Sequence, residues 1–262
     1  MKITLFTSSK QRHNYLINLL STVSKKIYVI QELDEEAKKI IPSKYSNNKL
    51  MQKYFDEVKK AQTKYFGDTQ IDLSSEKIKI QKISSGSLNS YSKDFFSEFL
   101  NSDVYIVFGS GYIKGELVKF LIDNKALNIH MGISPYYRGT DCNFWALYDD
   151  NPHLVGATIH LLSEDLDDGP ILYHAMSKIK LNPFEYTMST VKAAFYSLVE
   201  KIKNKSIFDI KPIARDITKE IRFSKKSQFN EEILKNYFLK TIDLKKKEFD
   251  LSLLKSPYFL ER

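Results

Sequence analysis

Three almost continuously apolar segments in the first half of the chain constrain its fold more than any other feature. They are ITLFT at 3–7, KIYVIQ at 26–31 and VYIVFG at 104–109. Runs with so little polar alternation are typical of parallel strands that helices cover on both faces. A further strand candidate lies at 77–83, and helix-like patterns lie at 13–23, 92–101 and 113–122. The chain is therefore predicted to be an α/β protein with a mainly parallel, doubly wound sheet.

Shorter elements are expected in the second half of the chain. Strands are predicted at 126–130, 156–162 and 171–180, and helices at 143–149 and from Pro183 to about 204. Together with the elements of the first half, they predict one main domain that spans residues 1–205.

Two segments do not fit the alternation of strands and helices. The polar segment at 35–68, around the turn-like SNN at 46–48, has the pattern of one or two exposed helices and is interpreted as an insertion. Residues 206–262 hold a helix-like run at 229–239 and many lysines, and we expect a short C-terminal extension there.

Composition excludes several classes of protein. At 262 residues and 42% hydrophobic, the chain can bury a full core. No segment approaches the roughly 20 apolar residues that a membrane span needs, and the opening MKITLFTSSK has no signal-peptide pattern. The single cysteine, Cys142, excludes an internal disulfide and a cysteine-cluster metal site. We expect a cytoplasmic protein without a metal.

The net charge of +8, from 40 Lys+Arg against 32 Asp+Glu, attracts anions such as nucleic acid or a nucleotide diphosphate. Much of the excess is lysine scattered through 52–64 and 240–248, and such runs are more often solvated helix faces than binding grooves. Charge alone therefore does not identify a nucleic-acid partner.

A glycine-containing turn, Gly109-Ser110-Gly111, follows one strand and precedes a helix. The next glycine, Gly115, comes one position too late for the dinucleotide fingerprint G-x-G-x-x-G, and the strand is not the first of the fold. We interpret the segment as a tight turn at a strand end that lines a pocket without binding phosphate.

Chemically informative residues are concentrated between 126 and 173. Asn128 and His130 lie two apart at the end of an apolar strand, so both side chains point to the same face. The loop MGISPYYRG follows and carries Arg138 and Gly139. An acidic loop, EDLDDGP at 164–170, then lies between two strands.

Each of these residues also has a structural interpretation when it is taken alone. An isolated histidine is more often structural than catalytic, and this is our default for His13, His153, His160 and His174. The aspartates of the acidic loop could form a solvated turn, and Trp145 is expected to pack in the core. Only the combination of motifs favours a catalytic site.

Four motifs follow one another here: an Asn-x-His strand end, a Tyr-x-Arg-Gly loop, a Trp-Ala-Leu helix and a Leu-Asp-x-Gly loop. In order and spacing they resemble the folate-dependent formyltransferases, a family that includes methionyl-tRNA, glycinamide ribonucleotide and sugar N-formyltransferases. The close resemblance spans about 104–175. It implies a Rossmann-like formyltransferase domain and N10-formyltetrahydrofolate as formyl donor.

By this resemblance the family's catalytic residues fall on Asn128, His130 and Asp167. Attack of an amine on a formyl carbon creates an oxyanion, which an amide N–H and an imidazole can stabilise. The carboxylate can orient the imidazole or accept the amine's proton.

We assign the remaining candidate residues to the two substrates. The residues predicted to bind the folate are Gly109, Ser110, Gly111, Tyr112, Ile113, Asp165 and Leu166. Those predicted to bind the acceptor are Arg12, His13, Arg138 and Gly139. For Arg138, a simple surface ion pair is an equal alternative to binding the substrate or fixing its loop.

The acceptor is inferred from positions where this sequence differs from the methionyl-tRNA and glycinamide ribonucleotide enzymes of the family that it resembles. The loop HMGISPYYRG replaces the His-Pro-Ser-Leu-Leu-Pro form of the tRNA and purine enzymes, and the first strand lacks the Gly-Thr turn of the tRNA enzymes. The tail also shows no run of alternating strands. The sequence thus favours formylation of a nucleotide-linked amino sugar, such as a dTDP-, UDP- or GDP-4-amino-4-deoxy sugar, for surface polysaccharide or lipopolysaccharide biosynthesis.

Other functions stay open as alternatives. They are methionyl-tRNA or glycinamide ribonucleotide formylation, hydrolysis of formyltetrahydrofolate, and nucleic-acid binding without catalysis. A homodimer is expected because many small α/β enzymes are dimers, although no heptad or apolar stripe locates an interface.

Overall fold

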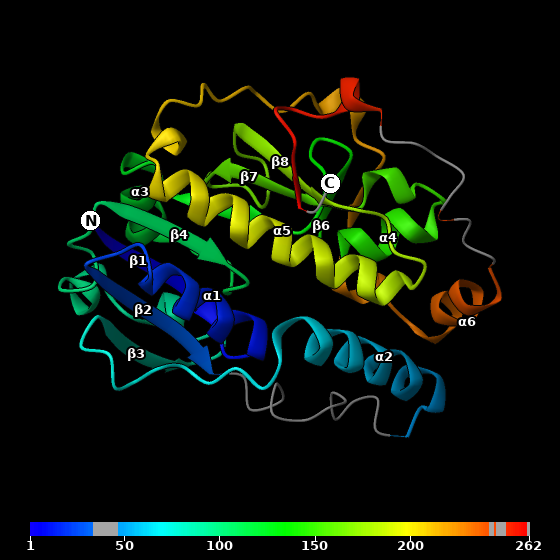
Figure 1. The fold of residues 1–262 in the computed structure, drawn as a ribbon, viewed down its shortest axis with the longest axis horizontal. Coiled ribbons are helices and arrows are strands. Elements are labelled where there is room, and N and C mark those ends of the chain that lie inside the picture. The colour runs from blue at the N-terminus through cyan, green and yellow to red at the C-terminus, as the bar shows by residue number, and fades with distance from the viewer. Residues whose placement is uncertain (34–46, 241–243, 245–249, 261–262) are drawn as a thin grey trace.

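The computed structural model describes residues 1–33, 47–240, 244 and 250–260. Its larger sheet (Figure 1) has the spatial order β10 (Tyr258–Leu260), β8 (Ile171–Ser177), β7 (Ala157–Leu161), β5 (Leu127–His130), β4 (Val104–Phe108), β1 (Lys2–Ser8), β2 (Lys26–Leu33) and β3 (Ile78–Ser84). A smaller sheet pairs β6 (Tyr137–Gly139) with β9 (Arg222–Ser224).

The α-helices are α1 (Gln11–Ser21), α2 (Lys49–Phe66), α3 (Gly115–Asp123), α4 (Cys142–Tyr148), α5 (Pro183–Lys203) and α6 (Glu231–Leu239). Short 3-10 turns lie at η3 (Leu88–Ser90), η4 (Lys93–Phe96), η5 (Pro152–Leu154), η6 (Ser206–Phe208), η7 (Ile217–Lys219), η8 (Lys226–Gln228) and η9 (Leu251–Leu253). Within the part of the chain that the structure describes, no helix combines the length and apolarity needed to cross a membrane.

Most strands of the larger sheet run in one direction. Neighbours from β3 to β5 pair in parallel, as do β8 and β10, whereas β7 is antiparallel to both β5 and β8. The chain moves outward from β1 to β2 and β3 on one side, then to β4 and β5 on the other. This confirms the predicted α/β sheet. The reversal creates a switch point between β1 and β4, and open α/β sheets bind ligands there, at the carboxyl ends of the strands.

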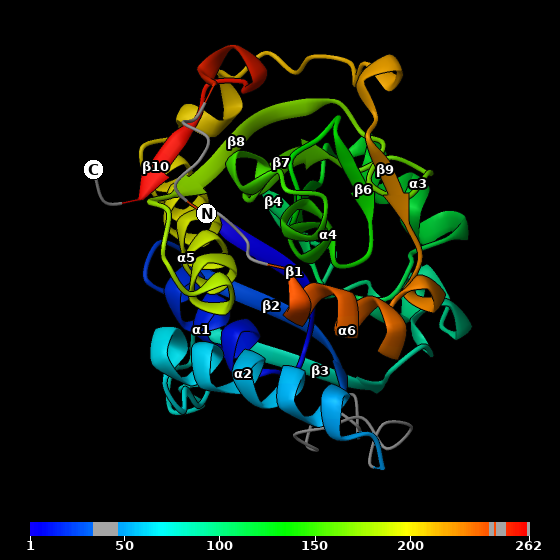
Figure 2. The ribbon, with the colours of Figure 1, turned by 90° about the vertical axis from the view of Figure 1, so that its right-hand side faces the viewer.

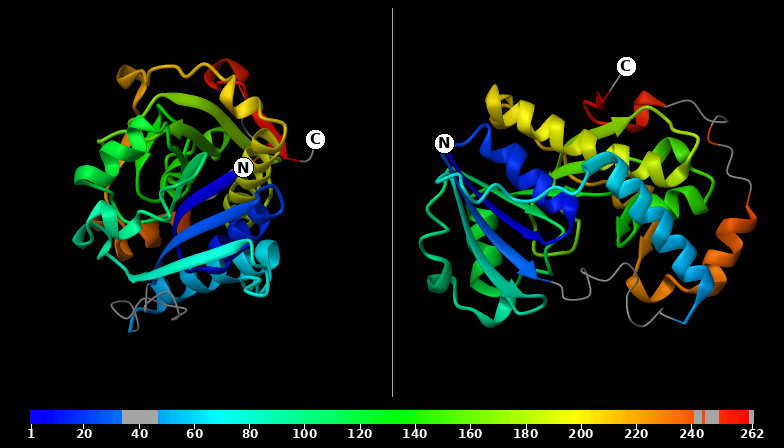
Figure 3. Two further views of the ribbon diagram at one scale, coloured as in Figure 1. Left: turned by 90° about the vertical axis from the view of Figure 1, so that its left-hand side faces the viewer. Right: turned by 60° about the horizontal axis from the view of Figure 1, so that its bottom comes forward.

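Strand alternation divides the apolar side chains of the sheet between two cores. On β4, Val104, Ile106 and Phe108 belong to one core, whereas Tyr105 and Val107 belong to the other. Helices α1 and α5 cover the first face and α3 covers the second (Figure 3, with α1 blue, α5 yellow and α3 green). Burial on both faces explains why these strands are almost continuously apolar.

Helix α2 occupies the later part of the insertion predicted at 35–68. Asn48 caps it by accepting hydrogen bonds from the backbone N–H groups of Leu50 and Met51 at 3.1 and 2.9 Å, which explains why the helix begins after the SNN turn. Residues 35–46 of that prediction lie outside the described residues.

The helix predicted at 92–101 is wrong in kind. The structure has only the 3-10 turn η4 there, followed by hydrogen-bonded turns. Its apolar spacing serves burial all the same, because Phe96, Phe99 and Leu100 all enter the second core.

The C-terminal part of the chain returns twice to the main body (Figure 2). Strand β9 lies beside β6, and β10 adds to the edge of the larger sheet beside β8. The predicted boundary at residue 205 stays a prediction.

Candidate active site

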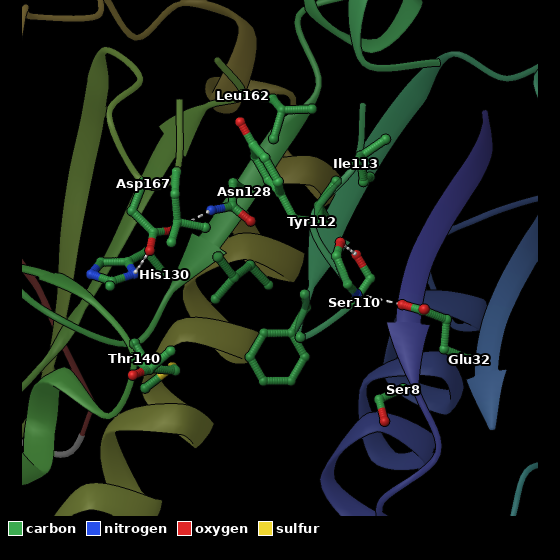
Figure 4. A pocket seen from close by; sticks show the side chains of 18 of the residues that line it. Ser8, Glu32, Ser110, Tyr112, Ile113, Asn128, His130, Thr140, Leu162 and Asp167 are labelled. Carbon is green, nitrogen blue, oxygen red and sulfur yellow. Dashed lines mark hydrogen bonds and ion pairs between the residues drawn. The ribbon is translucent and has the colours of Figure 1, made fainter. Parts of the chain in front are cut away.

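A pocket of about 520 Å³ opens at the switch point, at the carboxyl ends of the central strands (Figure 4). Ser8 at the end of β1, Glu32 near the end of β2 and His130 at the end of β5 all line it. Most predicted site residues also line it, namely Arg12, His13, Gly109, Ser110, Gly111, Tyr112, Ile113, Asn128, His130, Gly139, Asp165, Leu166 and Asp167. Arg138 is not among the lining residues.

The three residues predicted to be catalytic meet on one wall of this pocket. His130 Nδ1 lies 3.2 Å from one carboxylate oxygen of Asp167, and Asn128 Nδ2 donates to the other oxygen at 3.2 Å. Asn128 and His130 share a face of β5 as expected, and Asp167 reaches them from the loop between β7 and β8 (Figure 4).

His130 and Asp167 form a buried ion pair. Burial lowers the pKa of His130, but the Asp167 carboxylate, with a smaller contribution from Cys142, outweighs it and raises that pKa well above its usual value. Burial raises the pKa of Asp167, but the imidazolium outweighs this and leaves that pKa below its usual value. The second ring nitrogen, Nε2, donates to the carbonyl oxygen of Tyr137 at 3.0 Å. Both ring N–H groups therefore have acceptors, which favours the protonated form of His130.

His160 determines how the Asn128 amide is oriented. His160 Nδ1 donates to the carbonyl oxygen of Leu161 at 2.7 Å, so its Nε2 is free to accept a hydrogen bond from Asn128 Nδ2 at 2.9 Å. Burial lowers the pKa of His160 to about 4, which keeps the ring neutral. Nδ2 thus faces His160 and Asp167, and the amide oxygen points into the pocket (Figure 4).

This geometry differs from our expectation in two respects. We expected the Asn128 N–H group to face an oxyanion, whereas both of its N–H bonds are used inside the protein. We interpreted His160 as a structural histidine, whereas it lines the pocket opposite Asn128. No sequence signal shows this contact, because it depends on the antiparallel pairing of β5 with β7.

The acidic loop presents one of its aspartates to His130. Asp167 has a left-handed backbone with φ of 50°, and its neighbour Asp168 points away to Arg138 and Arg215. Asp165 lines the pocket without contacting the cluster. Gly169 lets the loop approach β7, because a Cβ there would lie 1.7 Å from the carbonyl oxygen of Leu161.

The turn after β4 is held by a residue that sequence analysis missed. The buried carboxylate of Glu32 accepts hydrogen bonds from the backbone N–H groups of Gly111 and Gly86, the latter at 2.9 Å. Gly109 has φ of 62°, and a Cβ there would lie 2.6 Å from the His13 ring. The turn therefore needs glycine for both conformation and space.

Arg12 and His13, two of the residues predicted to bind the acceptor, already have hydrogen-bond partners within the protein. Arg12 donates to Gln62 at 2.7 Å, and burial lowers its pKa to about 10 against the opposing charge of Asp141. His13 is buried, bonds to Thr7 at 2.7 Å and has a pKa well below its usual value, mainly through burial. His13 therefore forms a neutral wall of the pocket.

Arg138 contacts other protein groups instead of the pocket. Its guanidinium lies 3.2 Å from Asp168 and 3.3 Å from Glu220, and it stacks on the Phe223 ring at 4.2 Å. These contacts agree with the alternative in which Arg138 fixes its loop.

His174, His153 and Trp145 were also interpreted as structural residues. His174 donates from Nε2 to the Ser134 carbonyl at 2.8 Å and accepts from the backbone N–H of Lys255 at 2.9 Å, as a structural histidine does. His153 lies on η5 and does not line the pocket. Trp145 is buried in the first core.

Buried neutral histidines make the protein sensitive to acid. Burial lowers the pKa of His160 and His174 from 6.5 to about 4, so the unfolded chain binds more protons between these values. Stability should therefore fall as pH drops from about 6.5 to about 4, by about 3 kcal/mol for each ring. Urea unfolding across this range measures the loss, which should be smaller in His174→Gln because one of the three buried neutral rings, His13, His160 and His174, is then absent. A flat profile would contradict it.

Comparisons with known proteins find similarity over the region that holds this site. Residues 94–207 match the formyl transferase family model. A methionyl-tRNA formyltransferase of Thermotoga neapolitana is 36% identical over 90 residues, which are 34% of this chain and 28% of that protein. The similarity thus spans well under half of that relative's length.

Two solved structures share the fold. A sugar N-formyltransferase from Shewanella has a TM-score of 0.53 at 18% identity, covering 87% of this chain and 78% of its own. A glycinamide ribonucleotide transformylase from Symbiobacterium toebii has a TM-score of 0.53 at 14% identity, covering 82% and 94%. The family match spans the whole Asn128, His130 and Asp167 cluster, and this part of the chain is similar to the formyltransferases.

Proposed function

We propose that this protein is an N-formyltransferase that takes the formyl group of N10-formyltetrahydrofolate and transfers it to the amine of a nucleotide-linked amino sugar. The observation that carries the proposal is the buried His130–Asp167 ion pair with Asn128 beside it, on the wall of the switch-point pocket. The site thus offers a fixed positive charge, a carboxylate and an amide oxygen to one bound substrate pair.

Each of the three residues has a role that its geometry supports. The amide oxygen of Asn128 can accept an N–H of the attacking amine and orient its lone pair toward the formyl carbon. The His130 imidazolium supplies positive charge next to the oxygen that becomes negative during attack. Asp167 keeps His130 protonated and is the nearest base for the proton that the amine loses, directly or through water.

The pocket residues fit a folate donor. Tyr112 is 48% exposed and Leu166 is 43% exposed, although both border the pocket. A flat ring packed against them would cover this apolar surface. The turn at 109–111, which Glu32 holds, brings polar backbone groups to the same place.

The proposed acceptor is anionic. Lys10 and Arg12 line the pocket and suit the diphosphate of a nucleotide-linked sugar. The loop HMGISPYYRG, which departs from the form expected of tRNA and purine enzymes, supports a sugar acceptor. Initiator methionyl-tRNA is the second candidate, because the curated relative above is a methionyl-tRNA formyltransferase.

A substrate panel tests the proposal. The protein is incubated with N10-formyltetrahydrofolate and dTDP-, UDP- or GDP-linked 4-amino sugars, and formylated products are identified by mass spectrometry. We expect turnover with at least one nucleotide sugar and none with His130→Gln. Turnover restricted to initiator tRNA or glycinamide ribonucleotide would overturn the acceptor, and formate release without any amine would indicate a hydrolase.

A further inference from the structure

We infer that Arg215, on the segment 213–224 in the C-terminal part of the chain, is a positioning residue for Asp167. This inference rests on the proposed function. The segment runs past the loop between β7 and β8 before it forms β9 beside β6 (Figure 2).

Arg215 holds the catalytic loop through Asp168, the residue next to Asp167. Its Nε lies 2.5 Å from Asp168 Oδ1, and its Nη1 lies 2.8 Å from Glu220 Oε2. Arg138 contacts the same two acids, at 3.2 and 3.3 Å. Two arginines and two acids thus join three segments, of which one carries Asp167.

Burial makes this cluster more than a surface ion pair. The Arg215 side chain is only 6% exposed, and the Asp168 and Glu220 side chains are 32% and 25% exposed. A partly buried charge that loses its partner is costly, so each member holds the others in place. The pair Lys219–Asp216 on the same segment, 58% and 47% exposed at 3.7 Å, offers a matched comparison.

The same segment also holds His130, through a separate contact. β9 pairs with β6 in the register Tyr137 to Arg222 and Gly139 to Ser224. The carbonyl oxygen of Tyr137 accepts the hydrogen bond from His130 Nε2. A Cβ at Gly139 would lie 2.1 Å from the Ser224 carbonyl oxygen, which shows how closely the two strands approach.

Both partners of the ion pair therefore depend on one segment. Asp167 is placed through Asp168 and Arg215, and His130 is placed through Tyr137 and β9. Neither Arg215 nor Glu220 lines the pocket. A defect in Arg215 should consequently alter the reacting geometry more than the binding of substrates.

Arg215→Met, Arg215→Lys and Glu220→Gln test the inference, with Lys219→Met as control. We expect Arg215→Met to lower kcat on the order of 10²-fold while KM for both substrates changes less than about threefold. Arg215→Lys should recover part of kcat, because a lysine restores the charge but cannot contact both acids with a planar fork. Lys219→Met should match the wild type.

A second measurement does not need turnover. The ring nitrogens of His130, assigned by comparison with His130→Gln, are followed by NMR in the protein without substrates. Asp167, His160, Cys142 and His174 are the groups that affect or border this ring. We expect the pKa of His130 to fall in Arg215→Met and in Glu220→Gln, because Asp167 is no longer held against it.

The outcomes separate the two proposals. A wild-type kcat and an unchanged His130 signal in folded Arg215→Met would overturn the positioning role, and Glu220→Gln decides in the same way if Arg215→Met does not fold. If the wild-type protein transfers no formyl group, the proposed function fails, and the NMR result still decides whether Arg215 positions the ion pair.

Discussion

Replacement of Asp167 by Asn is expected to lower kcat for formyl transfer by about 10³- to 10⁴-fold. The side chain keeps its shape but loses the charge that holds the pKa of His130 above its usual value. Burial then dominates and lowers that pKa, so the ring becomes neutral at neutral pH. Initial rates with saturating donor and acceptor measure the loss.

The pH dependence of the activity tests the role of the ion pair independently of kcat. His130 is protonated in the wild type until pH rises through its raised pKa, so activity should persist through neutral pH and fall on the alkaline side. In Asp167→Asn the fall should move to lower pH. Glu164→Gln is the control, because Glu164 lies on the same loop but does not line the pocket or contact His130. This substitution should leave both kcat and the pH profile of activity unchanged. An Asp167→Asn enzyme with a wild-type profile would show that the ion pair does not govern the reaction.

Gly169→Ala is expected to have the second largest effect, a loss of about 3 kcal/mol of stability together with most of the activity. The added Cβ would lie 1.7 Å from the Leu161 carbonyl oxygen and 2.9 Å from the His160 ring. The loop must therefore move away from β7, and Asp167, two residues earlier, moves with it. Chemical unfolding and the steady-state rate measure the two losses.

Gly67→Ala is the matched control for this substitution. Gly67 has φ of 60°, but a Cβ added there would meet nothing within 4 Å, and the residue lies at the end of α2, outside the pocket. It should cost about 1–3 kcal/mol through backbone strain and leave the rate unchanged. Equal losses of the steady-state rate in the two variants would contradict the steric argument at Gly169.

Local patterns in the sequence account for much of the fold. The apolar runs in β1, β2 and β4 predict parallel strands buried on both faces, and the two cores contain their alternate side chains as that requires. Helix α5 begins at Pro183 after the Asn182 cap, both of which are local signals. The helix prediction at 92–101 was wrong because apolar residues at helical spacing indicate only that the segment is buried on one side. A short turn buries Phe96 and Leu100 equally well.

For the candidate site, too, local sequence explains some residues and not others. Asn128 and His130 follow from strand geometry, since residues two apart share a face whatever the rest of the chain does. The choice of Asp167 over Asp165 and Asp168 came from motif resemblance, and its physical reason is the left-handed backbone that directs one carboxylate to His130.

By itself, the sequence determined β1 to β5, β7 and β8, the described α-helices and the face that Asn128 and His130 share, because these depend on residues close together in the chain. It missed the short strands β6, β9 and β10. Only the tertiary structure decided the partners that orient the site residues: His160 across the β5–β7 pair, Glu32 under the turn after β4, and Arg215 behind Asp168. Their contacts join segments 32, 79 and 47 residues apart. No local propensity encodes such contacts, since sheet order and strand register bring the segments together.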